Sequence, residues 1–117
     1  MNLNQITLPV RDMGSAAQFY KMLGFTQIVD TPQYARFECP VGSSTFSLSL
    51  DTSEYINGAI IYFEHEKLDE WVVELKSKGI SFEQEPTDQR YLWREATLKD
   101  PSGNKIKGTD KLTATDG

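Results

Sequence analysis

The chain has 117 residues, of which 38% are hydrophobic and 25% charged, proportions that are typical of a folded globular protein and argue against disorder. Its length fits one compact domain, and its net charge of −5 makes nucleic acid an unexpected partner, because phosphate binding needs a cationic surface. A single cysteine excludes an intrachain disulfide and a zinc site built on several thiolates.

Membrane insertion and secretion are not indicated by the sequence. No apolar stretch approaches the roughly 20 residues that cross a bilayer. The first five residues lack the basic start and apolar run of a secretory leader. We therefore expect a cytoplasmic protein, with a small molecule or another protein as its partner.

The first half of the chain predicts a strand, a helix and three more strands. Apolar and other residues alternate over residues 5–10, which indicates a half-buried strand. Asp12 offers an N-cap carboxylate to a helix whose apolar residues recur at helical spacing as far as Leu23, and Gly24 ends it. Pro- and Gly-containing turns then separate strands predicted over residues 25–30, 34–39 and 45–50.

The second half predicts the same order of elements. A strand over residues 59–64 precedes a helix over Glu66–Lys78, which Gly79 ends. Three strands follow, over residues 80–85, 91–99 and 104–108, and Asp100–Asn104 is typical of a tight hairpin turn. Residues from Thr109 to Gly117 are polar and aperiodic, and we expect a frayed tail there.

The two halves correspond under a shift of 55 positions. The shift places Ile6 on Ile61, and the helix-ending Gly24 on Gly79. We infer an internal duplication and expect one domain made of two modules, residues 1–52 and 57–108. The predicted fold class is α+β.

Each helix can cover one face of its sheet, so the apolar face of each strand should lie toward the helix. The residues expected on that side include Ile6, Leu8, Val10, Ala35, Phe37, Cys39, Phe46, Leu48, Leu50, Ala59, Ile61, Phe63, Leu92, Ala96, Leu98 and Ile106. The opposite faces collect rings, hydroxyl groups and both signs of charge, as the lining of a small-molecule site does. The candidate ligand-binding residues are Gln5, Thr7, Arg36, Glu38, Ser47, Ser49, Ile60, Tyr62, Glu64, Trp93, Glu95 and Lys107.

Other catalytic groups are few. His65, the only histidine, lies between Glu64 and Glu66, which suits an exposed loop better than a catalytic base. Cys39 falls on the helix side and is expected to be a buried, inert thiol. A pair of carboxylates, Glu64 and Glu95, remains an alternative acid and base.

Three stretches carry a resemblance to a known family: Leu8–Asp12 running into Phe19–Phe25, Leu75–Phe82, and Trp93–Asn104. With them the chain resembles the vicinal oxygen chelate superfamily, which includes glyoxalase I, bleomycin-resistance proteins and extradiol dioxygenases. The resemblance implies two βαβββ modules with curled mixed sheets, and a homodimer.

The resemblance also implies where a metal ion is held in metal-dependent members, on the first and last strand of each module. Those positions are Gln5, Ser47 or Ser49, Ile60 and Lys107 in this sequence. Ile60 has no donor atom, a serine hydroxyl is a poor ligand, and the Lys107 ammonium repels a cation. We therefore expect no metal ligands and no cofactor.

Two functions from different classes, and a third possibility, follow. The first is a metal-free, small-molecule-binding protein that resembles the bleomycin-resistance type and holds an aromatic or cationic ligand in a cup between sheets. In that case Tyr62 and Trp93 pack on the ligand, carboxylates select positive groups, and Arg36 or Lys107 takes a carboxylate.

The alternative is a metal-dependent lyase, isomerase or dioxygenase with other ligands, such as Gln5, Glu38, Glu64 and Glu95. A partner-binding module is the third. Ion pairs between Glu95 and Arg36, or between Glu38 and Lys107, are a structural explanation for the charges.

Overall fold

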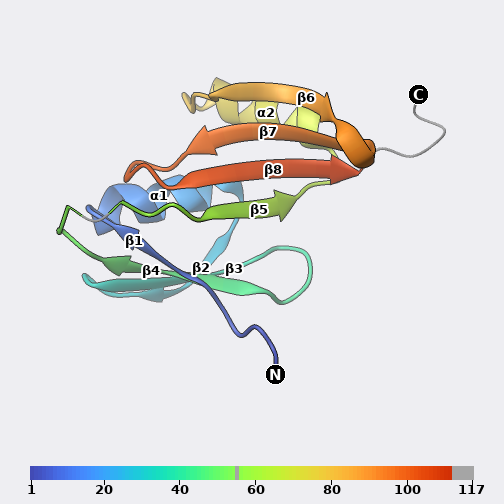
Figure 1. The fold of residues 1–117 in the computed structure, drawn as a ribbon. Helices are drawn as coiled ribbons and strands as arrows, with labels where there is room; N and C mark the ends of the chain where they lie inside the picture. Colours follow the sequence, from blue (N-terminus) through green and yellow to red (C-terminus); the bar gives the residue numbers. More distant parts are fainter. Residues whose placement is uncertain (55, 112–117) are drawn as a thin grey trace. The chain divides into compact units, whose positions relative to one another are not determined.

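The computed structural model of the chain describes residues 1–54 and 56–111, and for Tyr91 the backbone only. The first half contains β1 (Thr7–Val10), α1 (Met13–Leu23), β2 (Thr26–Asp30), β3 (Tyr34–Glu38) and β4 (Thr45–Leu50). The second half contains β5 (Ile60–Glu64), α2 (Leu68–Ser77), β6 (Gln84–Gln89), a 3₁₀ turn (Arg90–Leu92), β7 (Trp93–Lys99) and β8 (Lys105–Lys111). Both halves thus have the order βαβββ, labelled in Figure 1.

Each half forms one four-stranded mixed sheet. The strand orders are β1-β4-β3-β2 and β5-β8-β7-β6, which are the same order in the two halves. The first and last strand of each half run parallel, and the other neighbours run antiparallel. The α+β class and the two βαβββ modules that the sequence predicts are therefore confirmed.

The chain divides into two compact units that follow this repeat with one exception. The first unit contains Met1–Gly58 together with the turn Asp100–Asn104, and the second contains Ala59–Lys99 and the chain from Lys105 onward. The turn that joins β7 to β8 thus belongs to the first unit, although both strands belong to the second.

Both helices end where the sequence predicts. In α1, Oδ1 of Asp12 accepts a hydrogen bond from the backbone N–H of Ser15 at 3.1 Å, and Gly24 at φ 114° ends the helix. In α2 the C-cap is Lys78, and Gly79, at φ 91°, follows it directly. The predicted start of α2 at Glu66 is two residues early: the helix begins at Leu68, and its N-cap Lys67 makes no side-chain capping hydrogen bond.

The core of the first unit lies between α1 and its sheet. Tyr20 and Phe37 are fully buried, and Phe46 stacks on Phe37 with ring centroids 5.5 Å apart. Leu8 and Val10 are buried with them, as the alternation predicts. The prediction is wrong for two residues at the ends of the alternation: Ile6 is 40% exposed and Leu50 38%. Ile6 precedes β1 and Leu50 is the last residue of β4, so neither lies under the helix.

In the second unit, α2 packs on β6, β7 and β8. Its buried residues Leu68, Trp71, Val72 and Leu75 meet the apolar face formed by Ile61, Ala96, Leu98 and Ile106. Ala59 and Leu92 were expected on this face and are exposed. Ala59 precedes β5, and Leu92 closes the 3₁₀ turn at φ 64°, so neither follows the alternation of a strand.

The later strand bounds differ most from the predictions. The strand expected over 80–85 lies at Gln84–Gln89, and the strand expected from Tyr91 begins at Trp93 after the 3₁₀ turn. β8 continues to Lys111, so the predicted frayed tail is wrong for Thr109–Lys111. The rest of that predicted tail, residues 112–117, lies outside the described residues.

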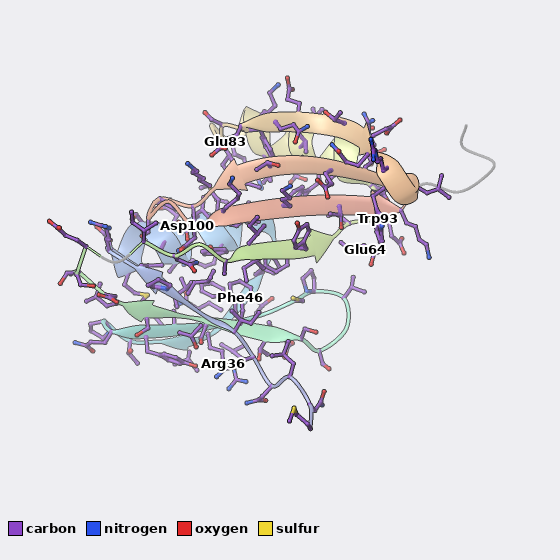
Figure 2. The ribbon with its side chains drawn as sticks, in the orientation of Figure 1. Arg36, Phe46, Glu64, Glu83, Trp93 and Asp100 are labelled. Carbon is purple, nitrogen blue, oxygen red and sulfur yellow. The ribbon has the colours of Figure 1, made fainter. Side chains whose placement is uncertain are left out.

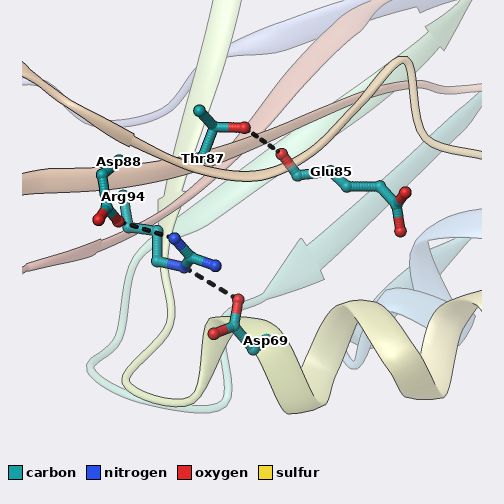
Figure 3. A network of polar contacts seen from close by, with 5 residues as sticks. All are labelled: Asp69, Glu85, Thr87, Asp88 and Arg94. Carbon is teal, nitrogen blue, oxygen red and sulfur yellow. Dashed lines mark hydrogen bonds and ion pairs between the residues drawn. The ribbon is translucent and has the colours of Figure 1, made fainter.

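One arginine connects α2 to the edge strand β6 (Figure 3). Nε of Arg94 lies 3.0 Å from Oδ1 of Asp69, at the start of α2, and Nη1 lies 2.7 Å from Oδ1 of Asp88 in β6. These two hydrogen bonds raise the pKa of Arg94. Arg94 therefore lies on the helix side of β7, and its neighbour Glu95 lies on the opposite face.

Candidate functional site

The open face of the first sheet, opposite α1, carries the predicted polar residues in neighbouring rows. Thr7, Ser47 and Arg36 lie side by side on β1, β4 and β3. Ser49 lies beside Tyr34 in the next row. The strand alternation thus places these candidates on one face, as predicted.

A short hydrogen-bonded chain occupies this face. Oγ of Ser47, a fully buried residue, lies 2.7 Å from Oγ1 of Thr7. Hydrogen bonding from Ser47 lowers the pKa of Tyr34; Gln5 and the Arg36 charge lower it further, and desolvation opposes them. Oε1 of Gln5 is buried and has no hydrogen-bond partner among the described residues. The face therefore offers hydroxyl groups and one unsatisfied amide oxygen.

The charged residues of this sheet are engaged or exposed. Nε and Nη2 of Arg36 both donate to Oγ1 of Thr45, at 3.2 and 2.9 Å. Glu38 lies beside Thr45 and is exposed. Arg36 thus bonds to a hydroxyl group of its own sheet, and Lys107 pairs with Glu95 within the second sheet.

The open face of the second sheet, opposite α2, is a regular grid of side chains. Strand register gives three rows, each crossing β5, β8 and β7 in that order. The rows are Ile60, Lys105 and Lys99; Tyr62, Lys107 and Thr97; and Glu64, Thr109 and Glu95. In a fourth row Lys111 lies beside Trp93. The five predicted residues of β5 and β7, with Lys107, all lie on this face.

Lys107 occupies the middle of the grid. Its Nζ lies 3.3 Å from Oε2 of Glu95 and 5.9 Å from the centre of the Tyr62 ring. The side chains of Lys107 and Glu95 are 23% and 18% exposed, whereas Tyr62 is 56% exposed. A half-buried ion pair thus lies beside an aromatic ring that is open to solvent.

Trp93 lies at the end of the second sheet where Glu64 also lies (Figure 2), and it is not in the same row as Tyr62. Trp93 is opposite Lys111, whereas Tyr62 is opposite Lys107. Four positions along β8 separate their rows, or about 13 Å. Tyr62 and Trp93 therefore belong to different rows of this face.

His65 and Cys39 have structural surroundings. Nδ1 of His65 accepts a hydrogen bond from the backbone N–H of Lys67 at 3.0 Å, and its ring lies 5.6 Å from that of Trp71. Cys39 is half-buried rather than buried, and desolvation, with the Glu38 charge, raises the pKa of its thiol. A raised pKa favours the unreactive thiol over the thiolate, in line with the predicted inert role.

Sequence reasoning did not include Lys105 and Thr109 among the site residues. Both lie on the open face because β8 alternates from Lys105 to Lys111. The alternation is visible in the sequence at Lys105, Ile106 and Lys107, but Gly108 and the polar residues after it hide its continuation. The signal that was missed is the alternation of β8, which continues beyond Gly108 although the residues there are not apolar.

Two cavities are found among the described residues. One, of about 160 Å³, lies in the first unit and is lined by Pro9, Arg11, Asp51, Ile56, Asn57, Ser102, Gly103 and Asn104. The other, of about 440 Å³, lies at the end of α2 and is lined by Lys76, Gly79, Ile80, Ser81, Phe82 and Glu85. None of the predicted site residues lines either cavity.

The fold and the open faces define an α+β protein of duplicated βαβββ units, and comparison with known proteins gives its family. The model of the Glyoxalase/Bleomycin resistance protein/Dioxygenase superfamily matches residues 2–107, so the chain belongs to this superfamily. No protein of curated function matches the sequence. None of the helices in the described part of the chain is long and apolar enough to span a membrane.

Solved structures share the fold at low sequence identity. A superfamily member from Sphaerobacter thermophilus is 22% identical, with a TM-score of 0.81 over 95% of this chain and 98% of that one. A family enzyme from Burkholderia phytofirmans is 20% identical, with a TM-score of 0.80 over 96% and 100%. A lactoylglutathione lyase from Agrobacterium tumefaciens is 17% identical, with a TM-score of 0.79 over 93% and 92%.

The residues at the positions where the resemblance implies metal ligands do not fit a divalent cation. In the second sheet Ile60 is aliphatic and lies beside Lys105, and Lys107 pairs with Glu95. In the first sheet the hydroxyl of Ser47 is bonded to Thr7, which leaves Gln5 as the one suitable donor. No group of three or more His, Cys, Asp and Glu residues in the described chain is arranged to hold a metal ion.

Proposed function

We propose that this chain is a metal-free, small-molecule-binding protein of its superfamily, similar to the bleomycin-resistance type, and that it takes an aromatic or cationic compound. The observation that carries this proposal is the arrangement of Tyr62, Lys107 and Glu95. An ammonium group occupies a position where the resemblance implies a metal ligand, and an exposed ring lies next to it. An exposed ring beside polar groups is suited to binding a planar organic molecule.

The experiment has two measurements on the purified protein. Elemental analysis tests the absence of a metal ion, and stoichiometric nickel, zinc, iron or manganese would overturn the proposal. Calorimetric titration with a panel of planar aromatic compounds, some carrying an amine, tests binding. Tyr62→Ala is expected to weaken binding about tenfold, because it removes the exposed ring. Val73→Ala, which shortens an exposed side chain on α2, is the matched control and should have no effect.

The second candidate function is a metal-dependent lyase, isomerase or dioxygenase. Glu64 and Glu95 favour it, because they lie in one row of the second sheet with Thr109 between them, about 10 Å apart at Cα. The ion pair between Lys107 and Glu95 disfavours this function, because one of the two carboxylates is already engaged. Glyoxalase or dioxygenase activity that a chelator abolishes and one metal ion restores would select this function.

We also propose that the protein is a cytoplasmic homodimer. The single Cys39 fits a reducing compartment, and Ile28, on the edge strand β2, is 48% exposed and available for contact with a second copy. Sedimentation of the purified chain as a monomer would contradict the dimer.

A further inference from the structure

The open face of the second sheet is cationic along its middle strand, although the chain as a whole has a net charge of −5. Lys105, Lys107 and Lys111 all project from this face of β8, and Lys99 lies directly opposite Lys105 on β7. Like charges that face each other across two strands are destabilising. An arrangement that concentrates them on one face therefore has a cost in stability that a bound anion would offset.

The lysines differ in what neutralises them. Lys107 pairs with Glu95, and Lys99 pairs with Glu83 at 3.2 Å. Lys105 has no carboxylate within ion-pair distance among the described residues, and it is half-buried between Ile60 and Lys99 in its row. Lys111, at the exposed end of β8, likewise has no ion pair with a described residue, so Lys105 is the half-buried lysine of this face whose charge is uncompensated among the described residues.

An exposed ring lies next to this charge. Tyr62 is two residues from Ile60 on β5, and Lys107 is two residues from Lys105 on β8, so the four side chains form a square on the face. Alternate residues of a strand are about 7 Å apart at Cα, so the ring and the ammonium group lie within the span of one small molecule. Ring and charge thus match the two ends of one small molecule.

We infer that the ligand of this face is an aromatic carboxylate, with its ring on Tyr62 and Ile60 and its carboxylate toward Lys105. This inference rests on the proposed function and selects among its ligand classes. It favours an acid over a cation beside Lys105, because the Glu95 carboxylate is already paired with Lys107 and Glu64 lies two rows away from Lys105. The face then gains a counter-ion for Lys105 without losing an existing ion pair.

Calorimetric titration with three probes of the same ring system tests the inference. The probes are naphthoate, naphthylmethylamine and naphthalenemethanol, which carry an acid, an amine and a neutral group. Naphthoate is expected to bind at least about tenfold more tightly than the other two, and its binding should weaken as salt is added. Equal or tighter binding of the amine or the alcohol would overturn the inference and leave the proposed function standing. Binding of none of the three would overturn both.

Two lysine variants locate the site. Lys105→Met keeps the aliphatic stem, removes the charge, and should weaken naphthoate binding about tenfold. Lys111→Met removes the same charge from the same face of β8, about 20 Å along the strand, and should leave binding unchanged. Equal effects of the two variants would show that the overall positive charge of the face, and not the position of Lys105, attracts the acid. Lys107 is not used, because its removal would leave Glu95 half-buried and unpaired.

Discussion

Tyr20 connects the aromatic core of the first unit to the turn Asp100–Asn104. It is fully buried among aromatic rings, and its hydroxyl donates to Oδ2 of Asp100 at 2.7 Å. The same carboxylate accepts hydrogen bonds from Nδ2 of Asn104 and from the backbone N–H groups of Ser102 and Asn104. A buried carboxylate with this many donors is satisfied without a cation.

The ionisation of Tyr20 predicts alkaline instability. Burial, together with the Asp100 charge and hydrogen bond, raises its pKa far above the ordinary value of 10.0. When the pKa of a group is raised in the folded state, the unfolded chain loses the proton at a lower pH than the folded chain does. The stability that this provides is fully present at pH values below 10.0, and it is lost as the pH rises toward the folded-state pKa. The free energy of unfolding, measured in urea, should therefore fall as the pH rises above 10.0.

Tyr20→Phe is the control for this prediction. It removes the ionising group and should reduce the dependence of unfolding free energy on pH in the alkaline range, although the variant is less stable at neutral pH because Asp100 loses a donor. An alkaline slope that is the same in both proteins would contradict the assignment to Tyr20.

The sequence could not predict this network. Helical spacing includes Tyr20 among the apolar residues that recur before Leu23, and Asp100 begins a predicted turn, but 80 residues separate the two. Spacing and periodicity indicate which residues are neighbours along the chain. They cannot show which distant carboxylate accepts a hydrogen bond from a buried hydroxyl group. The polar end of a tyrosine on an apolar helix face was the available hint.

At the scale of elements, the sequence predicted those that bury an apolar face. Helix α1 and the alternating strands β1, β3, β4 and β5 lie close to where periodicity placed them. β6 was misplaced because Gln84–Gln89 is an edge strand whose residues are polar on both faces and include Pro86. Polarity and proline protect an edge from pairing with other chains, and they remove the periodic signal as well. The predicted site residues lie together on the open faces of the sheets because side chains alternate between the two faces of a strand. The same period of two places the apolar residues in the core.

Gly108 sets how closely β8 approaches α2. A Cβ atom at this position would lie 2.8 Å from Cζ3 of Trp71 and 3.0 Å from Cδ1 of Leu68. We expect Gly108→Ala to lower the free energy of unfolding by about 1–3 kcal/mol, because the indole must move in a packed core. Chemical denaturation measures this loss. Gly58→Ala is the matched control, because a Cβ atom there would meet open space, and a loss of the same size in both variants would contradict the steric explanation.

At the scale of the whole molecule, the units are not continuous segments of chain. Residues 100–104 leave the second sheet after β7, join the first unit, and return to begin β8. Nδ2 of Asn104 donates to the carbonyl of Pro9 at 2.8 Å, and its Oδ1 accepts from Nδ2 of Asn57 at 2.9 Å. The backbone N–H of Arg11 donates to Oγ of Ser102 at 2.9 Å.

This arrangement predicts that a change after β7 is felt in α1. We expect Asp100→Ala to lower the protection of α1 amides against hydrogen exchange more than that of α2 amides. The substitution leaves the Tyr20 hydroxyl and the backbone N–H of Asn104 without their acceptor. The loss should be about 2–4 kcal/mol in opening free energy. Lys99→Met, one residue earlier and within the second unit, should leave α1 unchanged. Equal loss in both helices after the Asp100 change would contradict the prediction.

The placement of the Asp100–Asn104 turn also limits how chimaeras of this superfamily can be made. A recombinant that exchanges the second half of this chain for that of a relative also exchanges five residues on which the first half is built. Such a hybrid needs Asp and Asn at the two ends of the transplanted turn, matched to the host's tyrosine and first strand. The sequence of the turn in the second half is therefore tied to the packing of the first unit.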